Sequence, residues 1–156
     1  RPTIGPRVCA QSERRIVKLA GFYVSSDTAR TQLPVRNDPS NEEIDAALQL
    51  FSAMSGIVSL SEDPVPEVGV YELALYADSG NFMLMLSRYT DDGDHEVDTI
   101  TNPTAGEGEI EILGDLYQRC MTTRDIEPVR RCFHEFASTG NVQSASLKLH
   151  EGAGSP

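Results

Sequence analysis

Apolar residues recur at helical spacing in two parts of the chain. In residues 38–56 they form one face, a pattern typical of an amphipathic helix packed on a core. This face consists of Ile44, Ala47, Leu48, Phe51 and Met54. Asp38 or Ser40 can cap its start, and Glu43 lies three residues after Ser40, as a capping box requires. We expect Gly56 to end this helix.

The second helical pattern covers residues 124–138. Its apolar stripe consists of Ile126, Val129, Phe133 and Phe136. Thr123 or Asp125 can cap its start, and Pro128 is tolerated in a first turn. We expect Gly140 to end the helix, because glycine readily adopts the left-handed conformation of a C-cap.

Alternating or continuous apolar positions predict strands elsewhere in the chain. The expected strands are residues 14–24, 57–61, 70–77, 82–90, 95–101, 109–114 and 142–149. Residues 78–81 are typical of a hairpin turn. Residues 82–90 are apolar on both faces, which is typical of a central strand with a helix on one side. Residues 115–123 fit no single pattern.

Two of these strands have faces that can be assigned from the alternation. In the first, Tyr71, Leu73 and Leu75 should share one face. In the second, Ile110 and Ile112 should point inward, and the glutamates that alternate with them should point outward.

The order of elements predicts the fold class. A strand, a helix, a run of strands, a helix and a strand indicate an α+β domain. We expect a mainly antiparallel curved sheet of about five to seven strands, with two helices packed on one face. Residues 14–150 should form this single domain, flanked by flexible segments at residues 1–13 and 151–156.

The charged residues are unevenly distributed along the chain, whose net charge is −11. Residues 1–37 hold seven basic and two acidic residues, and residues 38–127 hold three basic and twenty acidic residues. Nucleic acids need a basic surface, and anionic membranes repel an acidic one. We therefore expect neither nucleic acid nor membrane as a partner.

The three cysteines, Cys9, Cys120 and Cys132, lack the short spacing of a zinc or redox site. Cys120 and Cys132 lie in apolar-periodic stretches, so we expect reduced thiols in or near the core. Free thiols indicate a reducing compartment, which predicts a cytoplasmic location.

The acidic excess is sharpest in residues 90–99, TDDGDHEVDT. Its carboxylates are Asp91, Asp92, Asp94, Glu96 and Asp98. An EF-hand loop needs glycine at its sixth position and glutamate at its twelfth, and this stretch has neither. Three interpretations stay open: a solvated turn, a looser calcium or small-molecule site, and a surface for a cationic partner.

Two further features favour the cationic partner. Glu109 and Glu111 occupy alternate positions of one predicted strand, as Glu96 and Asp98 do in another. If such strands pair, like charges face one another at a cost in stability that a cationic partner would offset. Tyr89 lies beside the acidic stretch, and tyrosine adds contact area and cation–π attraction to an interface that binds Arg or Lys side chains.

The sequence has no motif of a familiar catalytic site. It has no Gly-x-Ser-x-Gly, no glycine-rich phosphate loop and no His-Glu-x-x-His, and its three histidines, His95, His134 and His150, are scattered. We therefore expect a protein that is not an enzyme and needs no cofactor. An enzyme of unrecognised type stays open as an alternative.

Residues 127–147, EPVRRCFHEFASTGNVQSASL, combine a helix bearing Phe-x-x-Phe, a Thr-Gly turn and a final strand. This segment resembles the end of small bacterial immunity proteins that neutralise polymorphic or interbacterial toxins. Residues 38–61 resemble their early helix-and-strand unit, and residues 71–89 their central hairpin. Residues 112–129 also resemble a related bacterial family without assigned function. Unlike many immunity domains, the chain has no tryptophan.

The resemblance implies an inhibitor that binds a toxin domain and blocks its active site or substrate groove. Immunity partners of nucleases are often acidic, because a nuclease groove is basic. We therefore predict an immunity protein for a cognate basic toxin domain, such as a nucleic-acid-attacking enzyme. From charge alone, the predicted interface consists of Asp91, Asp92, Asp94, Glu96, Asp98, Glu109, Glu111 and Tyr89.

Overall fold

The computed structural model describes residues 15–25 and 29–149. Their main sheet is seven-stranded and antiparallel, in the order β2-β1-β4-β5-β6-β7, with β3 also paired to β1. Its strands are β1 (Ile16–Val24), β2 (Arg30–Gln32), β3 (Arg36–Asn37), β4 (Ser55–Asp63), β5 (Gly69–Asp78), β6 (Asn81–Tyr89) and β7 (His95–Asp98). The segments predicted to be flexible, residues 1–13 and 151–156, lie outside the described residues.

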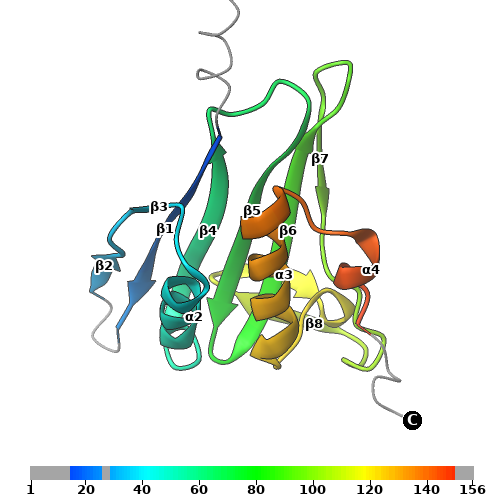
Figure 1. Ribbon diagram of the computed structural model, residues 1–156. Helices are drawn as coiled ribbons and strands as arrows, with labels where there is room; N and C mark the ends of the chain where they lie inside the picture. Colours follow the sequence, from blue (N-terminus) through cyan, green and yellow to red (C-terminus); the bar gives the residue numbers. More distant parts are fainter. Residues whose placement is uncertain (1–14, 26–28, 150–156) are drawn as a thin grey trace, which may run out of the picture.

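Two helices, α2 (Asn41–Leu50) and α3 (Ile126–Thr139), cover one face of this sheet (Figure 1). A short helix, α4 (Ser144–Leu147), follows α3. On the other side of the sheet lies a hairpin of β8 (Glu109–Ile112) and β9 (Asp115–Gln118), and the 3-10 helix η1 (Arg119–Met121) follows it. The architecture confirms the predicted α+β class with an antiparallel sheet and helices on one face.

The core lies between the two helices and the sheet. The helices contribute Phe51, Phe133 and Phe136, which are fully buried. The facing strands contribute Leu60, Leu73, Leu75, Leu84 and Leu86. Each such side chain stabilises the fold by roughly 1.5–3 kcal/mol when it leaves water. We call the sheet face that carries these leucines the helix face, and the opposite one the outer face.

The helix ends follow the predicted caps in three of four places. The Ser40 hydroxyl accepts from the Glu43 N–H at 3.1 Å, and the Glu43 carboxylate accepts from the Ser40 N–H at 3.0 Å. Asp125 caps α3, and Gly140 ends it in the left-handed conformation at φ 79°. Gly56, however, does not end α2, which stops at Leu50. It lies in β4, where a Cβ would overlap the backbone of β1.

The final predicted strand, residues 142–149, is wrong. The segment forms α4, and its only strand-like pairing among the described residues is an isolated bridge between Lys148 and Thr101, which follows β7. The reason is a contact from α3: the Glu135 carboxylate accepts from the Gln143 N–H at 2.8 Å and from the Ser146 hydroxyl at 2.7 Å. These bonds satisfy polar groups at the start of a helical turn.

The β8–β9 hairpin covers one end of the outer face. The Leu113 N–H donates to the Asp78 carboxylate at 2.9 Å, beside the β5–β6 turn. Ile112 is fully buried there, while Glu109 and Glu111 are exposed, which confirms the predicted alternation in β8. Toward the opposite end, the outer face of β4, β5 and β6 stays partly exposed.

Candidate functional site: the acidic turn and the Tyr71 bulge

The acidic turn, residues 90–94, joins β6 to β7 and is held closed by Thr90. The Thr90 N–H donates to the Asp94 carbonyl at 2.8 Å, and the Asp94 N–H donates to the Thr90 hydroxyl at 3.1 Å. The same hydroxyl donates to the Asp92 carboxylate, and this bond lowers the pKa of Asp92. Asp91, Asp92 and Asp94 are all exposed, so an ordered backbone presents three carboxylates to solvent.

These three carboxylates carry no counter-charge within the described part of the chain, where no salt bridge reaches them. Glu96 and Asp98 differ. Glu96 lies opposite Arg88 and Asp98 lies opposite Leu86, and the Arg88 guanidinium is 2.6 Å from the Asp98 carboxylate and 3.8 Å from that of Glu96. Arg88 is two positions from Leu86 in β6, so both side chains lie on the helix face. The ion-paired group of Arg88, Glu96 and Asp98 is therefore on the other side of the sheet from Tyr89.

A β-bulge shapes the outer face next to the acidic turn. The pairing between β5 and β6 shifts between Val70 and Glu72, which makes Tyr71 the extra residue. A bulge re-aims a side chain, and here it overturns the predicted face of Tyr71. Instead of joining Leu73 on the helix face, Tyr71 stacks on Tyr89, with ring centroids 4.5 Å apart and an interplanar angle of 17°.

His95 completes an aromatic cluster with these two tyrosines. Its ring centroid lies 5.9 Å from that of Tyr71 and 6.0 Å from that of Tyr89. His95 directly follows the acidic turn and pairs with Tyr89 across the strands. The structure therefore places the predicted Tyr89 and the predicted Asp91, Asp92 and Asp94 on neighbouring parts of one surface.

Glu72 lies beside the aromatic cluster on the outer face. The bulge brings it opposite Ser87, and Ser61 lies opposite it on β4. Burial raises the pKa of Glu72, and a hydrogen bond with Ser59 opposes that rise. Sequence reasoning missed Glu72, although an acidic residue within the apolar run VYELALYA is the signal that could have singled it out.

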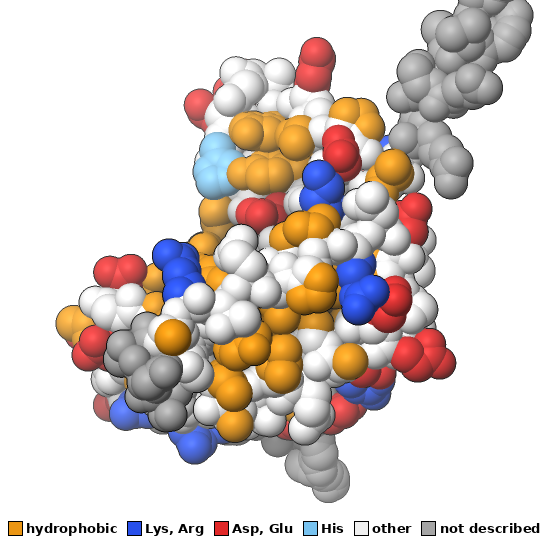
Figure 2. Space-filling view, turned by 90° about the vertical axis from the view of Figure 1, so that its left-hand side faces the viewer, with side chains coloured by type: hydrophobic (Ala, Val, Ile, Leu, Met, Phe, Trp, Pro, Cys, Tyr) orange, Lys and Arg blue, Asp and Glu red, His pale blue; other side chains and the backbone are white. Residues whose placement is uncertain are grey.

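Exposed apolar side chains and a further carboxylate border this surface. The loop between β4 and β5 reaches it because Gly69 pairs with Tyr89. Val65 is 59% exposed and Val68 is 52% exposed, with the exposed Glu67 between them. Near the top of Figure 2, hydrophobic side chains and a histidine gather with acidic side chains above and beside them. We call the acidic turn, the aromatic cluster, Glu72 and this loop together the bulge surface.

Glu109 and Glu111 do not belong to the bulge surface. Their hairpin is anchored at Asp78, at one end of β5, whereas the aromatic cluster lies by Gly69 at the other end. At about 3.3 Å per residue, these ends are roughly 30 Å apart. The structure thus separates two groups of carboxylates that the sequence analysis had combined.

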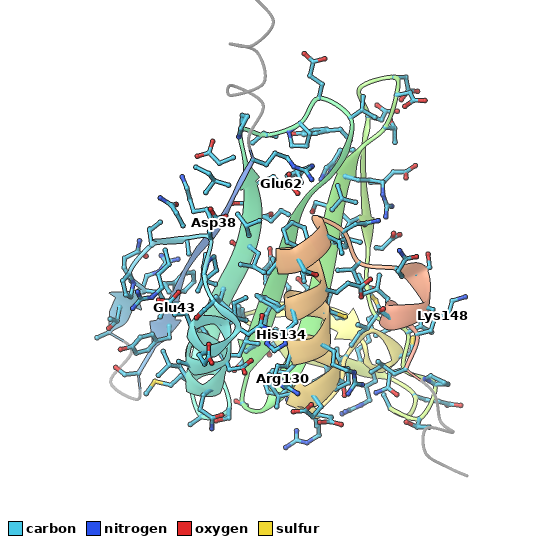
Figure 3. All side chains as sticks on the ribbon, viewed as in Figure 1. Asp38, Glu43, Glu62, Arg130, His134 and Lys148 are labelled. Carbon is cyan, nitrogen blue, oxygen red and sulfur yellow. The ribbon has the colours of Figure 1, made fainter. Side chains whose placement is uncertain are left out.

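Titratable groups also meet on the helix side of the molecule. The His134 ring nitrogen Nε2 lies 2.8 Å from the Asp45 carboxylate, and Arg130 lies 3.7 Å from the same carboxylate. These contacts join α3 to α2 (Figure 3). Arg130 also forms two hydrogen bonds to Glu127 on its own helix, at 2.9 and 3.0 Å. The group therefore ties the two helices together.

The described cysteines are free thiols, and they form no metal site with other described residues. Cys132 is buried among core residues, and burial raises the pKa of its thiol to about 11. Cys120 is a free thiol as well, while Cys9 lies outside the described residues. In residues 15–25 and 29–149, no three His, Cys, Asp or Glu side chains converge in a way that could hold a metal ion. None of the helices in these ranges has the length and apolar character needed to cross a membrane.

Comparison with known proteins gives a fold relationship. Residues 16–146 match the model of a protein family described as a family of unknown function, DUF6911. The crystal structure of a hypothetical protein from Neisseria gonorrhoeae is similar, with a TM-score of 0.75 and 24% sequence identity. The similarity covers 85% of this chain and 93% of that one, and it shows a shared fold. No curated protein matches the chain.

Proposed function

The chain belongs to this family of unknown function, and we propose that it is an immunity protein that binds and inhibits a cognate basic toxin domain. One observation carries the proposal: three exposed carboxylates on an ordered turn, without a salt bridge to any described residue, lie next to a stacked pair of tyrosines. An interface that captures a basic protein combines these features, because carboxylates attract its cations and tyrosines provide contact area.

The proposed mechanism of inhibition is steric and electrostatic. Enzymes that attack nucleic acids bind phosphates with a basic groove. The bulge surface would occupy that groove, its carboxylates taking the place of phosphates and its tyrosines that of bases. Inhibition of this kind needs no catalytic group or cofactor on the inhibitor. A cytoplasmic location belongs to the same proposal, because the buried Cys132 and the free Cys120 suit a reducing compartment.

The experiment compares two triple charge reversals. In the first variant, Asp91→Lys, Asp92→Lys and Asp94→Lys alter the acidic turn. In the matched control, Glu107→Lys, Glu109→Lys and Glu111→Lys make the same change in net charge at the exposed β8 end. Each immobilised protein captures binders from a host lysate at low and moderate salt. The captured basic protein is then purified, and its activity is measured with and without this chain.

We expect the unchanged protein and the β8 control to capture the basic protein and inhibit it. The turn variant should lose about tenfold or more in affinity, because nearby opposite charges become like charges. Equal loss in both variants would assign binding to net charge rather than to the turn. Capture without inhibition would contradict the immunity function.

A second candidate function, small-molecule binding, is favoured by a pocket away from the acidic turn. The pocket of about 290 Å³ lies between α2 and the segment that contains β3. Its lining is mainly apolar and includes Leu19, Leu33 and Leu50, while an ion pair of Arg36 and Glu43 at 3.3 Å lies at its edge. A ligand there would raise the melting temperature, and Ala46→Trp, which fills the pocket, should abolish that rise.

A further inference from the structure

We infer that the bulge surface receives an arginine side chain of the partner, which lies on the tyrosine stack and ion-pairs with Glu72. This inference rests on the proposed function, since it names the chemical group by which a basic partner would be recognised. It concerns the aromatic cluster and Glu72, whereas the toxin experiment alters the acidic turn.

Glu72 hydrogen-bonds with Ser59 but has no cationic partner among the described residues. It is partly buried, and no salt bridge to it occurs among the residues that the structure describes. The nearest candidates by position are engaged elsewhere. Lys18 lies in the same row of the outer face, two strands away, and pairs with Asp63 at 3.5 Å. Arg88 points to the helix face and binds Glu96 and Asp98.

The surroundings of Glu72 favour a guanidinium over an ammonium group. Tyr71 and Tyr89 offer a stacked pair of rings, and a planar guanidinium packs on an aromatic ring better than a compact ammonium does. Glu72 and Tyr89 lie on the same face at diagonal positions of neighbouring strands, a spacing of roughly 7–8 Å that an extended arginine spans. The hydroxyls of Ser61 and Ser87 flank the carboxylate and can accept further guanidinium hydrogen bonds.

The bulge explains why this arrangement exists at one place in the sheet. In a regular strand Tyr71 and Glu72 would point to opposite faces. The extra residue brings both to the outer face, so the aromatic ring and the carboxylate become neighbours. Stacking on Tyr89, with ring centroids 4.5 Å apart, keeps the Tyr71 ring on the outer face. Such re-aiming of a side chain is a recurrent use of bulges at functional sites.

The test uses capped tripeptides in place of the unidentified partner. Gly-Arg-Gly, Gly-Lys-Gly and Gly-citrulline-Gly are titrated into isotope-labelled full-length protein, and backbone amide shifts are followed by NMR. Citrulline keeps the shape of arginine and removes its charge. We expect saturable shifts at Tyr71, Glu72, Ser87 and Tyr89 with the arginine peptide, binding at least about threefold weaker with lysine, and no binding with citrulline.

Two variants test whether binding of the arginine peptide depends on Glu72 or only on the negative net charge of the protein. Glu72→Gln should raise the Kd of the arginine peptide about tenfold, as expected for the loss of a charge-assisted hydrogen bond. Glu111→Gln, the same change on the exposed β8 strand, should leave it unchanged. The amide spectrum of each variant shows whether it is folded.

Equal affinity for the arginine and lysine peptides, or shifts confined to residues 90–94, would overturn the arginine site. This result is independent of the toxin experiment. The peptides report on Glu72 whether or not a toxin is inhibited, and loss of inhibition in the turn variant reports on the function whether or not arginine is preferred.

Discussion

Glu62 is a buried carboxylate whose ionisation is costly for the fold. Its side chain is 1% exposed, and its Oε1 lies 3.0 Å from Arg15 Nη1. Burial raises the pKa of Glu62, and the Arg15 guanidinium only partly opposes the rise. A carboxyl whose pKa is higher in the folded state binds its proton more tightly there. It therefore contributes most stability below its ordinary pKa, and that contribution is lost as the pH rises through the raised value.

Glu62→Gln should consequently flatten part of the pH dependence of stability. The free energy of unfolding of the unchanged protein should fall relative to that of the variant as the pH rises above the ordinary glutamate pKa of 4.5. Urea unfolding at several pH values measures this difference. Glu72, whose pKa burial also raises, is present in both proteins and cancels in the comparison. Parallel curves would mean that Glu62 does not titrate differently in the folded state.

Glycine is favoured at position 140 by both the backbone conformation and the lack of space for a Cβ, so Gly140→Ala should destabilise the fold for two reasons. Its φ of 79° disfavours any residue with a Cβ, and a Cβ would overlap Glu62 Oε2. Gly108→Ala is the matched control, because its φ of 94° is also positive but a Cβ there meets nothing within 4 Å. We expect Gly140→Ala to lower the free energy of unfolding by at least about 1 kcal/mol more than the control does. Equal losses would show that Glu62 moves aside freely.

At the scale of elements, local patterns predicted most of the fold, and contacts distant in sequence explain the failures. The Ser40 capping box and the Gly140 C-cap depend on neighbours in the chain, so they were visible in the sequence. The bulge at Tyr71 depends on pairing with β6, and α4 depends on Glu135 of α3. The candidate site was only partly predictable for the same reason: the acidic turn was found, but Glu72 was not.

The role of Glu135 leads to a prediction about α4. Glu135→Ala removes the acceptor of both the Gln143 N–H and the Ser146 hydroxyl, so α4 should open locally. Amide hydrogen exchange of residues 143–147 should accelerate about tenfold, as the loss of a helix cap predicts. Ser144→Ala is the control, since Ser144 is exposed on the same short helix. Unchanged exchange in Glu135→Ala would mean that the packing of Leu147 alone holds the segment.

At the scale of the whole molecule, the net charge of −11 and the separation of charged groups suggest different tasks for different carboxylates. The exposed turn can act on a partner at a distance, because its carboxylates are exposed and form no salt bridge with the described residues. Glu72, partly buried beside the aromatic cluster, can act only in contact. Charges at the edge of an interface mainly affect the association rate, whereas buried charged pairs affect the dissociation rate.

Binding kinetics with the captured basic protein should therefore separate the two groups of carboxylates. The triple variant Asp91→Asn, Asp92→Asn and Asp94→Asn should lower the association rate by about tenfold at low salt and little at high salt, because ions screen long-range attraction. Glu72→Gln should instead raise the dissociation rate at both salt concentrations, since the proposed ion pair with the partner's arginine would be shielded from solvent in the complex. Surface plasmon resonance measures both rates. If the turn variant changed only the dissociation rate, the turn would be a contact site like Glu72. The prediction that its carboxylates attract a partner over a long range would then be wrong.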